Sequence, residues 1–231
     1  MLYLLPNTLD DDYDISSLSL NLKDIISTLD AIICESRKVA IRYLLKFLKR
    51  EEANNLPIYT LNEHTKKEEL DELLSLISKK KVGLLSDAGL PCIADPGSSL
   101  VFLANKNNIK VKASFGPSSI FLSLMLSGLN SQKFYFHGYL PKQEDLLIKK
   151  LKKIEKEILL EHSSQVFIET PYRSDRLLKF ILSNIDENVY LSISINLTKK
   201  DEKVITKKIR EFKKINLIIN KNPAVFVLGV R

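Results

Sequence analysis

The chain has 231 residues, 45% of them hydrophobic, and this length and apolar content predict a folded globular protein with one large or two small domains. No apolar run approaches the roughly 18 residues of a membrane span, and the N-terminus lacks a signal-peptide pattern, so we expect a cytoplasmic protein without a membrane partner. The cysteines and histidines lack disulfide or zinc spacing, so we expect no metal site. The net charge of +7 favours a polyanionic partner, but 28 of the 35 basic residues are lysine, and a coding bias toward A and T would produce the same excess.

The N-terminal half alternates short apolar segments with amphipathic ones. Leucine and isoleucine recur through residues 70–77 at the spacing of one helical face. Strands are predicted at residues 2–6, 31–35, 57–61, 81–87 and 110–114, and helices at residues 23–30, 36–50, 66–80 and 97–108. This regular order of strand and helix predicts a mainly parallel sheet with helices on its faces.

The C-terminal half has a different pattern, because its last strands follow one another closely. Helices are predicted at residues 118–128, 142–163 and 172–184, and strands at residues 133–141, 165–170, 188–197, 203–209 and 223–230. Consecutive strands with brief connections indicate hairpins and hence a mixed sheet. We therefore expect two α/β domains, residues 1–113 with a mainly parallel sheet and residues 114–231 with a mixed sheet.

The segment LLSDAGLPCIADPG, residues 84–97, concentrates glycine, proline and aspartate directly after a predicted strand. Ligands of open α/β sheets bind at the carboxyl ends of the strands, where Asp87 would lie. Gly89 lets a ligand approach the main chain, and Pro91 fixes the loop. The spacing matches neither GxxxxGKS/T nor GxGxxG, and a carboxylate beside exposed amides suits a ligand with hydroxyls and a positive centre. The alternative is a tight turn that caps the next helix and binds no ligand.

Two further loops have the same character. FGPSSI, residues 115–120, places Ser118 and Ser119 before a helix at the junction of the two halves, and IETP, residues 168–171, places Glu169 and Thr170 at a strand end. The serines could equally be helix N-caps, and the second loop could equally be a capped helix start.

These blocks carry a family resemblance. LLSDAGLPCIADPGSSLV, FGPSSIFLSLMLSGL, KFYFHGYLP, FIETPYRSDRLL and PAVFVLGV resemble, in this order, the tetrapyrrole methylase family of S-adenosylmethionine-dependent methyltransferases. Within that family the chain is similar to the branch that methylates ribose 2′-hydroxyls of 16S rRNA, and the resemblance runs from about Leu2 to Gly229.

The resemblance implies two α/β domains with S-adenosylmethionine in the cleft between them, and a homodimer. It implies that the loop from Ser86 to Pro91 approaches the methionine part of the cofactor, that Ser118 and Ser119 bind its polar end or ribose, and that Glu169 and Thr170 flank the adenosine. Pro223 and Ala224 would close on the adenine. The cofactor-binding residues expected on this basis are Ser86, Asp87, Ala88, Gly89, Pro91, Ser118, Ser119, Glu169, Thr170, Pro223 and Ala224.

The first loop departs from the family pattern. The branch has PTPIGNL after its first strand, whereas this chain has LLPNTLDDDYD, which contains acids and no glycine. This loop is on the side expected to face the methyl acceptor. Three functions therefore stay open: an rRNA ribose methyltransferase, a small-molecule methylase of the tetrapyrrole type, and a cofactor-binding protein without catalysis.

A ribose hydroxyl is a poor nucleophile, so a base is expected to accept its proton. The candidates are Glu35, Glu63 and His64, at or just after predicted strand ends; the alternatives are a loop-capping histidine and a glutamate paired with an arginine. For rRNA or the small ribosomal subunit as partner, the candidate phosphate ligands are Arg37, Arg42 and Arg173, since arginine forks match phosphate geometry.

Overall fold

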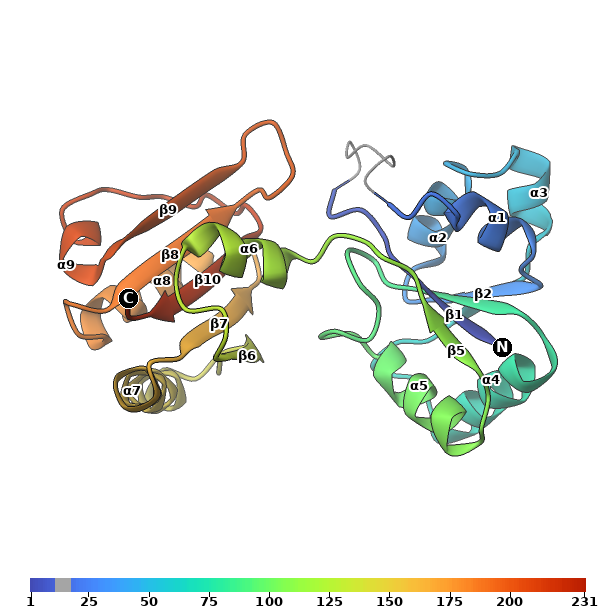
Figure 1. The fold of residues 1–231 in the computed structure, drawn as a ribbon, viewed down its shortest axis with the longest axis horizontal. Coiled ribbons are helices and arrows are strands. Elements are labelled where there is room, and N and C mark those ends of the chain that lie inside the picture. The colour runs from blue at the N-terminus through green and yellow to red at the C-terminus, as the bar shows by residue number, and fades with distance from the viewer. Residues whose placement is uncertain (11–17) are drawn as a thin grey trace. The chain divides into compact units, whose positions relative to one another are not determined.

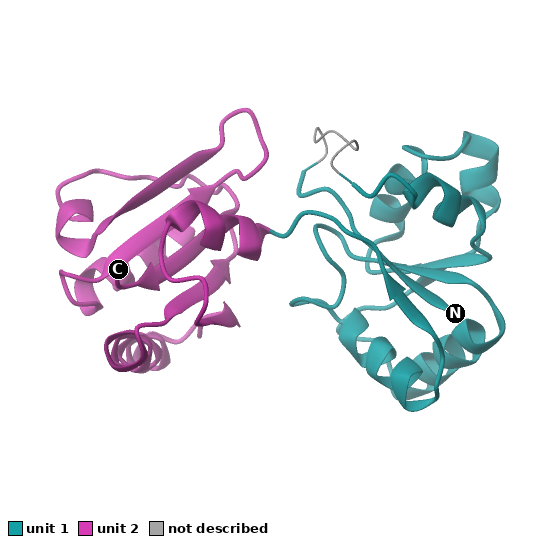
Figure 2. Cartoon of the chain, in the orientation of Figure 1, with its two compact units in different colours: residues 1–118 teal, residues 119–231 magenta. Residues whose placement is uncertain are grey.

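The computed structural model describes residues 1–10 and 18–231, which form two compact units, Met1–Ser118 and Ser119–Arg231 (Figure 2). The division follows Ser118, whereas the sequence placed it after residue 113. Most of the acidic run of the first loop, residues 11–17, lies outside the described residues. In the two described ranges, no helix is long and apolar enough to cross a membrane.

The first unit is built on a five-stranded parallel sheet of order β3-β2-β4-β1-β5 (Figure 1). Its strands are β1 Leu2–Leu5, β2 Ala31–Cys34, β3 Ile58–Thr60, β4 Val82–Leu85 and β5 Val111–Ala113, and its helices are α1 Leu22–Ser27, α2 Arg37–Leu44, α3 Arg50–Asn55, α4 Lys67–Lys79 and α5 Gly97–Lys106. The predicted parallel sheet is confirmed. Strands β2 and β4 are buried along their whole length, because hydrophobic clusters cover both faces of the sheet at these central strands.

The single helix predicted over residues 36–50 is wrong. Helix α2 ends at Leu44, and a series of tight turns leads to α3, which begins at Arg50. The carboxylate of Glu52 accepts the backbone N–H of Lys49 (2.9 Å), so it caps a new helix where the periodicity alone indicated continuation.

The second unit is built on a mixed sheet of order β6-β7-β10-β8-β9. Strands β6 and β7 are parallel, whereas β10 runs antiparallel to β7 and β8, and β9 antiparallel to β8, so the predicted mixed sheet is confirmed. The strands are β6 Phe134–Tyr139, β7 Ser164–Glu169, β8 Tyr190–Ile195, β9 Lys203–Lys208 and β10 Ala224–Gly229, and the helices are α6 Ser119–Ser127, α7 Glu144–Glu161, α8 Ser174–Asn184 and α9 Ile209–Phe212.

Two hydrophobic clusters cover the two faces of this sheet. Helices α7 and α8 pack on one face, around the rings of Phe167 and Phe226, which stack 5.6 Å apart. Helix α6 packs on the other face through Ile120 and Leu124. The apolar stripe of α7 is fully buried and its lysines face solvent, as the amphipathic pattern predicts.

Candidate active site

Three loops of the first unit meet at the carboxyl edge of its sheet. Strand β1 lies between β4 and β5, so the loops that follow these three strands leave the sheet side by side. The chain goes from β1 to β2 in one direction along the sheet and from β4 to β5 in the other (Figure 1). Such a divergence is where open α/β sheets bind their ligands.

Asn7 joins the loop after β1 to the loop after β4. Its side-chain amide donates to the carbonyl oxygens of Ser86 (3.2 Å) and Asp87 (3.0 Å), and its backbone N–H donates to that of Gly89 (2.7 Å). Asn7 is not among the site residues predicted from the sequence. The available signal was an asparagine two residues after the first strand.

Two glycines allow the third loop to approach. A Cβ on Gly116 would overlap the Cβ of Pro6, so only glycine fits where the loop after β5 crosses the loop after β1. Gly89 has a φ of +69°, and a Cβ there would meet the carbonyl oxygen of Pro117 at 3.4 Å. Between these contacts Asp87 and Ala88 are exposed, whereas Ser86 and Pro91 are buried. The loop therefore has a fixed base and an open tip.

The second half of the same loop is held by Asp95. One of its carboxylate oxygens accepts the backbone N–H groups of Cys92 (3.1 Å) and Gly97 (2.7 Å). Cys92 and Ala94 have φ values of 71° and 56°, which side chains other than glycine rarely adopt. A carboxylate that ties two amides maintains this conformation up to the start of α5.

Glu35 follows β2, at the same edge of the sheet, and is half-buried. Burial, a hydrogen bond with Asp95 and the negative charges of Asp95 and Asp87 raise the pKa of Glu35 from 4.5 to about 7. A carboxyl with this pKa exchanges its proton near neutral pH, which is the property required of a general base.

The other two base candidates have different surroundings. Glu63 and His64 follow β3, the outermost strand on the far side of β2, and their side chains are each 84% exposed. The imidazole Nε2 lies 3.6 Å from a carboxylate oxygen of Glu63, and the backbone N–H of His64 donates to Asn62 (2.8 Å). Neither side chain meets the buried surroundings that perturb Glu35.

Arg37 and Arg42 are exposed on α2, which begins two residues after Glu35. The guanidinium of Arg37 donates to the carbonyl oxygen of Ile58 (3.4 Å). Both arginines therefore lie exposed on the helix that follows the base candidate.

Four of the predicted residues of the second unit, Glu169, Thr170, Pro223 and Ala224, lie at one edge of the mixed sheet, whereas Ser119 begins α6. Ala224 pairs with Glu169 on one neighbouring strand and with Ile195 on the other. The side chain of Glu169 is fully buried, accepts the backbone N–H of Thr170 (2.7 Å) and forms an ion pair with Arg173 (2.9 Å). Arg173 is therefore already engaged by a carboxylate.

Asn196 belongs to this edge and was missed by the sequence analysis. It is buried, has a φ of 51°, and donates its backbone N–H to the carbonyl oxygen of Pro223 (3.1 Å). Its side-chain amide donates to Asp201 (2.7 Å), while its side-chain oxygen has no partner among the described residues. An asparagine directly after a strand was the only signal for it.

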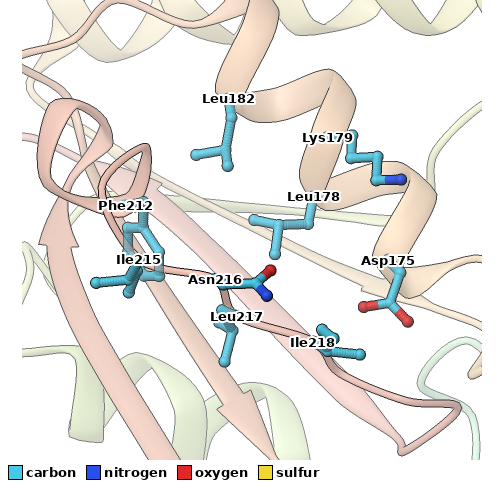
Figure 3. A pocket seen from close by; sticks show the side chains of 9 residues that line it. All are labelled: Asp175, Leu178, Lys179, Leu182, Phe212, Ile215, Asn216, Leu217 and Ile218. Carbon is cyan, nitrogen blue, oxygen red and sulfur yellow. The ribbon is translucent and has the colours of Figure 1, made fainter.

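A pocket of about 420 Å³ lies elsewhere in the second unit, between α8 and the segment that follows α9 (Figure 3). Its walls are mainly apolar, and Asp175 and Lys179 from α8 are its only charged residues. None of its lining residues is a predicted site residue. In the described ranges, no group of three or more histidine, cysteine, aspartate or glutamate side chains could hold a metal ion.

Residues 14–213 match the family model for tetrapyrrole (corrin/porphyrin) methylases. Among curated proteins, the chain is 33% identical over 202 residues to "Ribosomal RNA small subunit methyltransferase I" of Thermotoga maritima, with 83% of this chain and 85% of that protein covered. The protein of the same name from Hydrogenobaculum sp. is 32% identical, with 99% and 95% covered, and that from Buchnera aphidicola is 30% identical, with 87% and 67% covered.

Solved structures share the fold at low sequence identity. A diphthine synthase superposes with a TM-score of 0.65 at 16% identity, covering 99% of this chain and 89% of that one. The methyltransferase CobJ superposes with a TM-score of 0.62 at 12% identity, covering 99% and 92%. These superpositions establish the fold of both units.

Proposed function

The chain belongs to the family of tetrapyrrole methylases and is a methyltransferase, and from this premise we propose that it transfers a methyl group from S-adenosylmethionine to a ribose 2′-hydroxyl of 16S rRNA. The names of its relatives support the rRNA acceptor. The observation that carries the chemistry is Glu35, whose pKa of about 7 suits a base for a hydroxyl, at the sheet edge beside the glycine loop.

The loop after β4 fits the cofactor. Its tip exposes Asp87 and Ala88, and the buried Gly89 packs against the loop after β5, which holds this tip in place. S-adenosylmethionine carries a sulfonium, so its methyl group is already electrophilic. We assign the remaining cofactor contacts as the sequence predicts, to Ser118, Ser119, Glu169, Thr170, Pro223 and Ala224.

The protein has to align the ribose oxygen with the methyl carbon and accept one proton. Bound S-adenosylmethionine would supply an electrophilic methyl group with sulfur as the leaving group, and the Glu35 carboxylate would accept the hydroxyl proton. Alignment of such groups supplies roughly 7–11 kcal/mol. The rigid base of the loop, fixed by Asn7, is the part of the first unit that provides this alignment.

Arg37 and Arg42 are the proposed phosphate ligands, because they lie exposed on α2 directly after Glu35. Arg173 is a weaker candidate, since its guanidinium pairs with Glu169. The homodimer and the cytoplasmic location stay predictions, which light scattering and cell fractionation would check.

Two measurements test the proposal. Calorimetry with S-adenosylmethionine should detect binding by the purified chain, and a chain that binds none would remove the methyl-transfer mechanism. Mapping 2′-O-methylation of 16S rRNA in cells with and without the gene should then show one gene-dependent site. An unchanged methylation map would remove the rRNA acceptor and leave a small-molecule acceptor to be sought.

A further inference from the structure

Tyr172 lies at the tip of the turn that connects β7 to α8 and is 81% exposed. The backbone N–H of Arg173 donates to the carbonyl oxygen of Thr170 (2.9 Å), which closes the turn, and Pro171 fixes its first corner. The ring contributes little apolar burial to the fold. Its large flat surface is therefore available to a ligand.

The ammonium of Lys221 lies over one face of this ring, 5.4 Å from the ring centroid, which leaves the other face for a stacked base. The backbone of Lys221 has a φ of 60°, and the preceding Asn220 has a φ of 52°. A lysine rarely adopts this left-handed conformation, and strain of this kind concentrates at functional positions. The carboxylate of Asp175 holds the turn, because it accepts the backbone N–H groups of Ile219 (2.7 Å) and Asn220 (3.2 Å).

Lys221 is exposed, and in the part of the chain that the structure describes no carboxylate forms a salt bridge with it. The carboxylate of Asp175 accepts two backbone amides of the same turn, and that of Glu169 pairs with Arg173. An exposed cation next to an exposed aromatic ring suits a ligand that combines an anion with a flat ring.

The position in the sheet relates this pair to the proposed function. Tyr172 follows β7 and Lys221 precedes β10, and these strands pair with Glu169 opposite Ala224. We propose that Tyr172 and Lys221 bind one unpaired nucleotide of the RNA substrate, with the base stacked on Tyr172 and the adjacent phosphate on Lys221. This inference rests on the proposed function. S-adenosylmethionine has a base but no phosphate, so the lysine favours RNA over the cofactor.

Stacking of bases on aromatic side chains and charge pairing with phosphates are the two components of single-strand binding. Replacing Tyr172→Ala should weaken binding of a fluorescent oligouridylate by roughly 5- to 150-fold, the range for one stacked base. Tyr172→Phe keeps the ring and should restore wild-type affinity. Lys221→Gln should weaken binding and reduce the dependence of log affinity on log salt by about 0.7, the loss of one phosphate contact.

The chain offers matched controls. Lys208 lies 5.4 Å from the ring of Tyr190, the same distance as in the proposed site, and Lys208→Gln should leave binding unchanged. Tyr139, an exposed tyrosine of β6, gives the second control as Tyr139→Ala. Thermal unfolding should show that each variant is folded, because all of these side chains lie at the surface.

These experiments distinguish failure of the nucleotide site from failure of the proposed rRNA methyltransferase function. Unchanged oligouridylate affinity in Tyr172→Ala would overturn the nucleotide site, as would an equal loss of affinity for S-adenosylmethionine, which would assign the ring to the cofactor. Normal affinity for the cofactor with weakened oligonucleotide binding and a raised KM for 16S rRNA would support it. Wild-type protein that binds oligouridylate and methylates no rRNA would overturn the proposed function while the site remains.

Discussion

Replacing Glu35→Gln removes the proposed base and leaves a side chain of the same size. In the wild type a pKa of about 7 means that half of the molecules carry the carboxylate at neutral pH. Each unit of pH below that value should lower kcat/KM about tenfold, because only the carboxylate accepts the hydroxyl proton. The variant should lose about 10²- to 10⁴-fold in rate, or roughly 3–5 kcal/mol of barrier reduction, and the acidic limb of its pH profile should disappear.

The same substitution should raise stability, which distinguishes a catalytic role from a structural one. The folded-state pKa of Glu35 is above its ordinary value of 4.5, so the fold favours the neutral form. The stability that this provides is present below about pH 4.5 and is lost as pH rises through about 7. Glutamine resembles the neutral form, and the variant should therefore unfold at a higher temperature than the wild type above pH 7.

The assay is single-turnover transfer of labelled methyl groups from S-adenosylmethionine to 16S rRNA, measured across the pH range with thermal unfolding alongside. Asp71→Asn, an exposed carboxylate of α4, is the control and should keep the wild-type rate and profile. Full activity in Glu35→Gln would refute the assignment. A wild-type profile that stays flat through pH 7 would refute the link between pKa and rate.

Three further substitutions test the site. Asn7→Ala loses two hydrogen bonds to the loop after β4, worth about 1 kcal/mol each, so calorimetry should show weaker binding of S-adenosylmethionine. An unchanged affinity would mean that the Asn7 side chain does not organise this loop. Gly116→Ala would force a methyl group into the proline after β1 and should cost about 1–3 kcal/mol in urea denaturation, and wild-type stability would contradict the close approach. Arg173→Ala leaves the buried charge of Glu169 unpaired and should cost about 3–5 kcal/mol, a loss that Glu169→Gln in the same chain should largely recover.

The helices and strands could largely be predicted, because the spacing of apolar residues within each segment indicates them. The buried stripe of α7 and the parallel arrangement of the first unit follow from spacings within a few residues. The division of residues 36–50 into two helices could not be read from the same spacing. It depends on one carboxylate, that of Glu52, which caps a helix within a continuous amphipathic pattern.

Site residues whose side-chain type indicates a chemical role could be predicted from the sequence. Residues that act by positioning other segments of the chain could not. Glu35 was a candidate because it follows a strand, but its pKa depends on burial and on Asp95 and Asp87 from a different loop. Asn7 was missed because its partners are about eighty positions away in the chain, and nothing near it in the sequence records them. Tyr172 was named only as part of a motif, because exposure is a property of the folded chain.

The strand order of the first unit also governs how the chain can fold during synthesis. Strand β1 is made first, yet both of its neighbours, β4 and β5, begin at Val82 and Val111. At typical translation speeds β1 waits about 4–15 s for its first partner. Until then the backbone groups at both edges of β1 have no partner strand, and the loop whose carbonyl oxygens accept hydrogen bonds from Asn7 has not been synthesised. The nascent first unit is therefore exposed to aggregation over this interval, and its earliest synthesised loop is among the last parts to reach its final form.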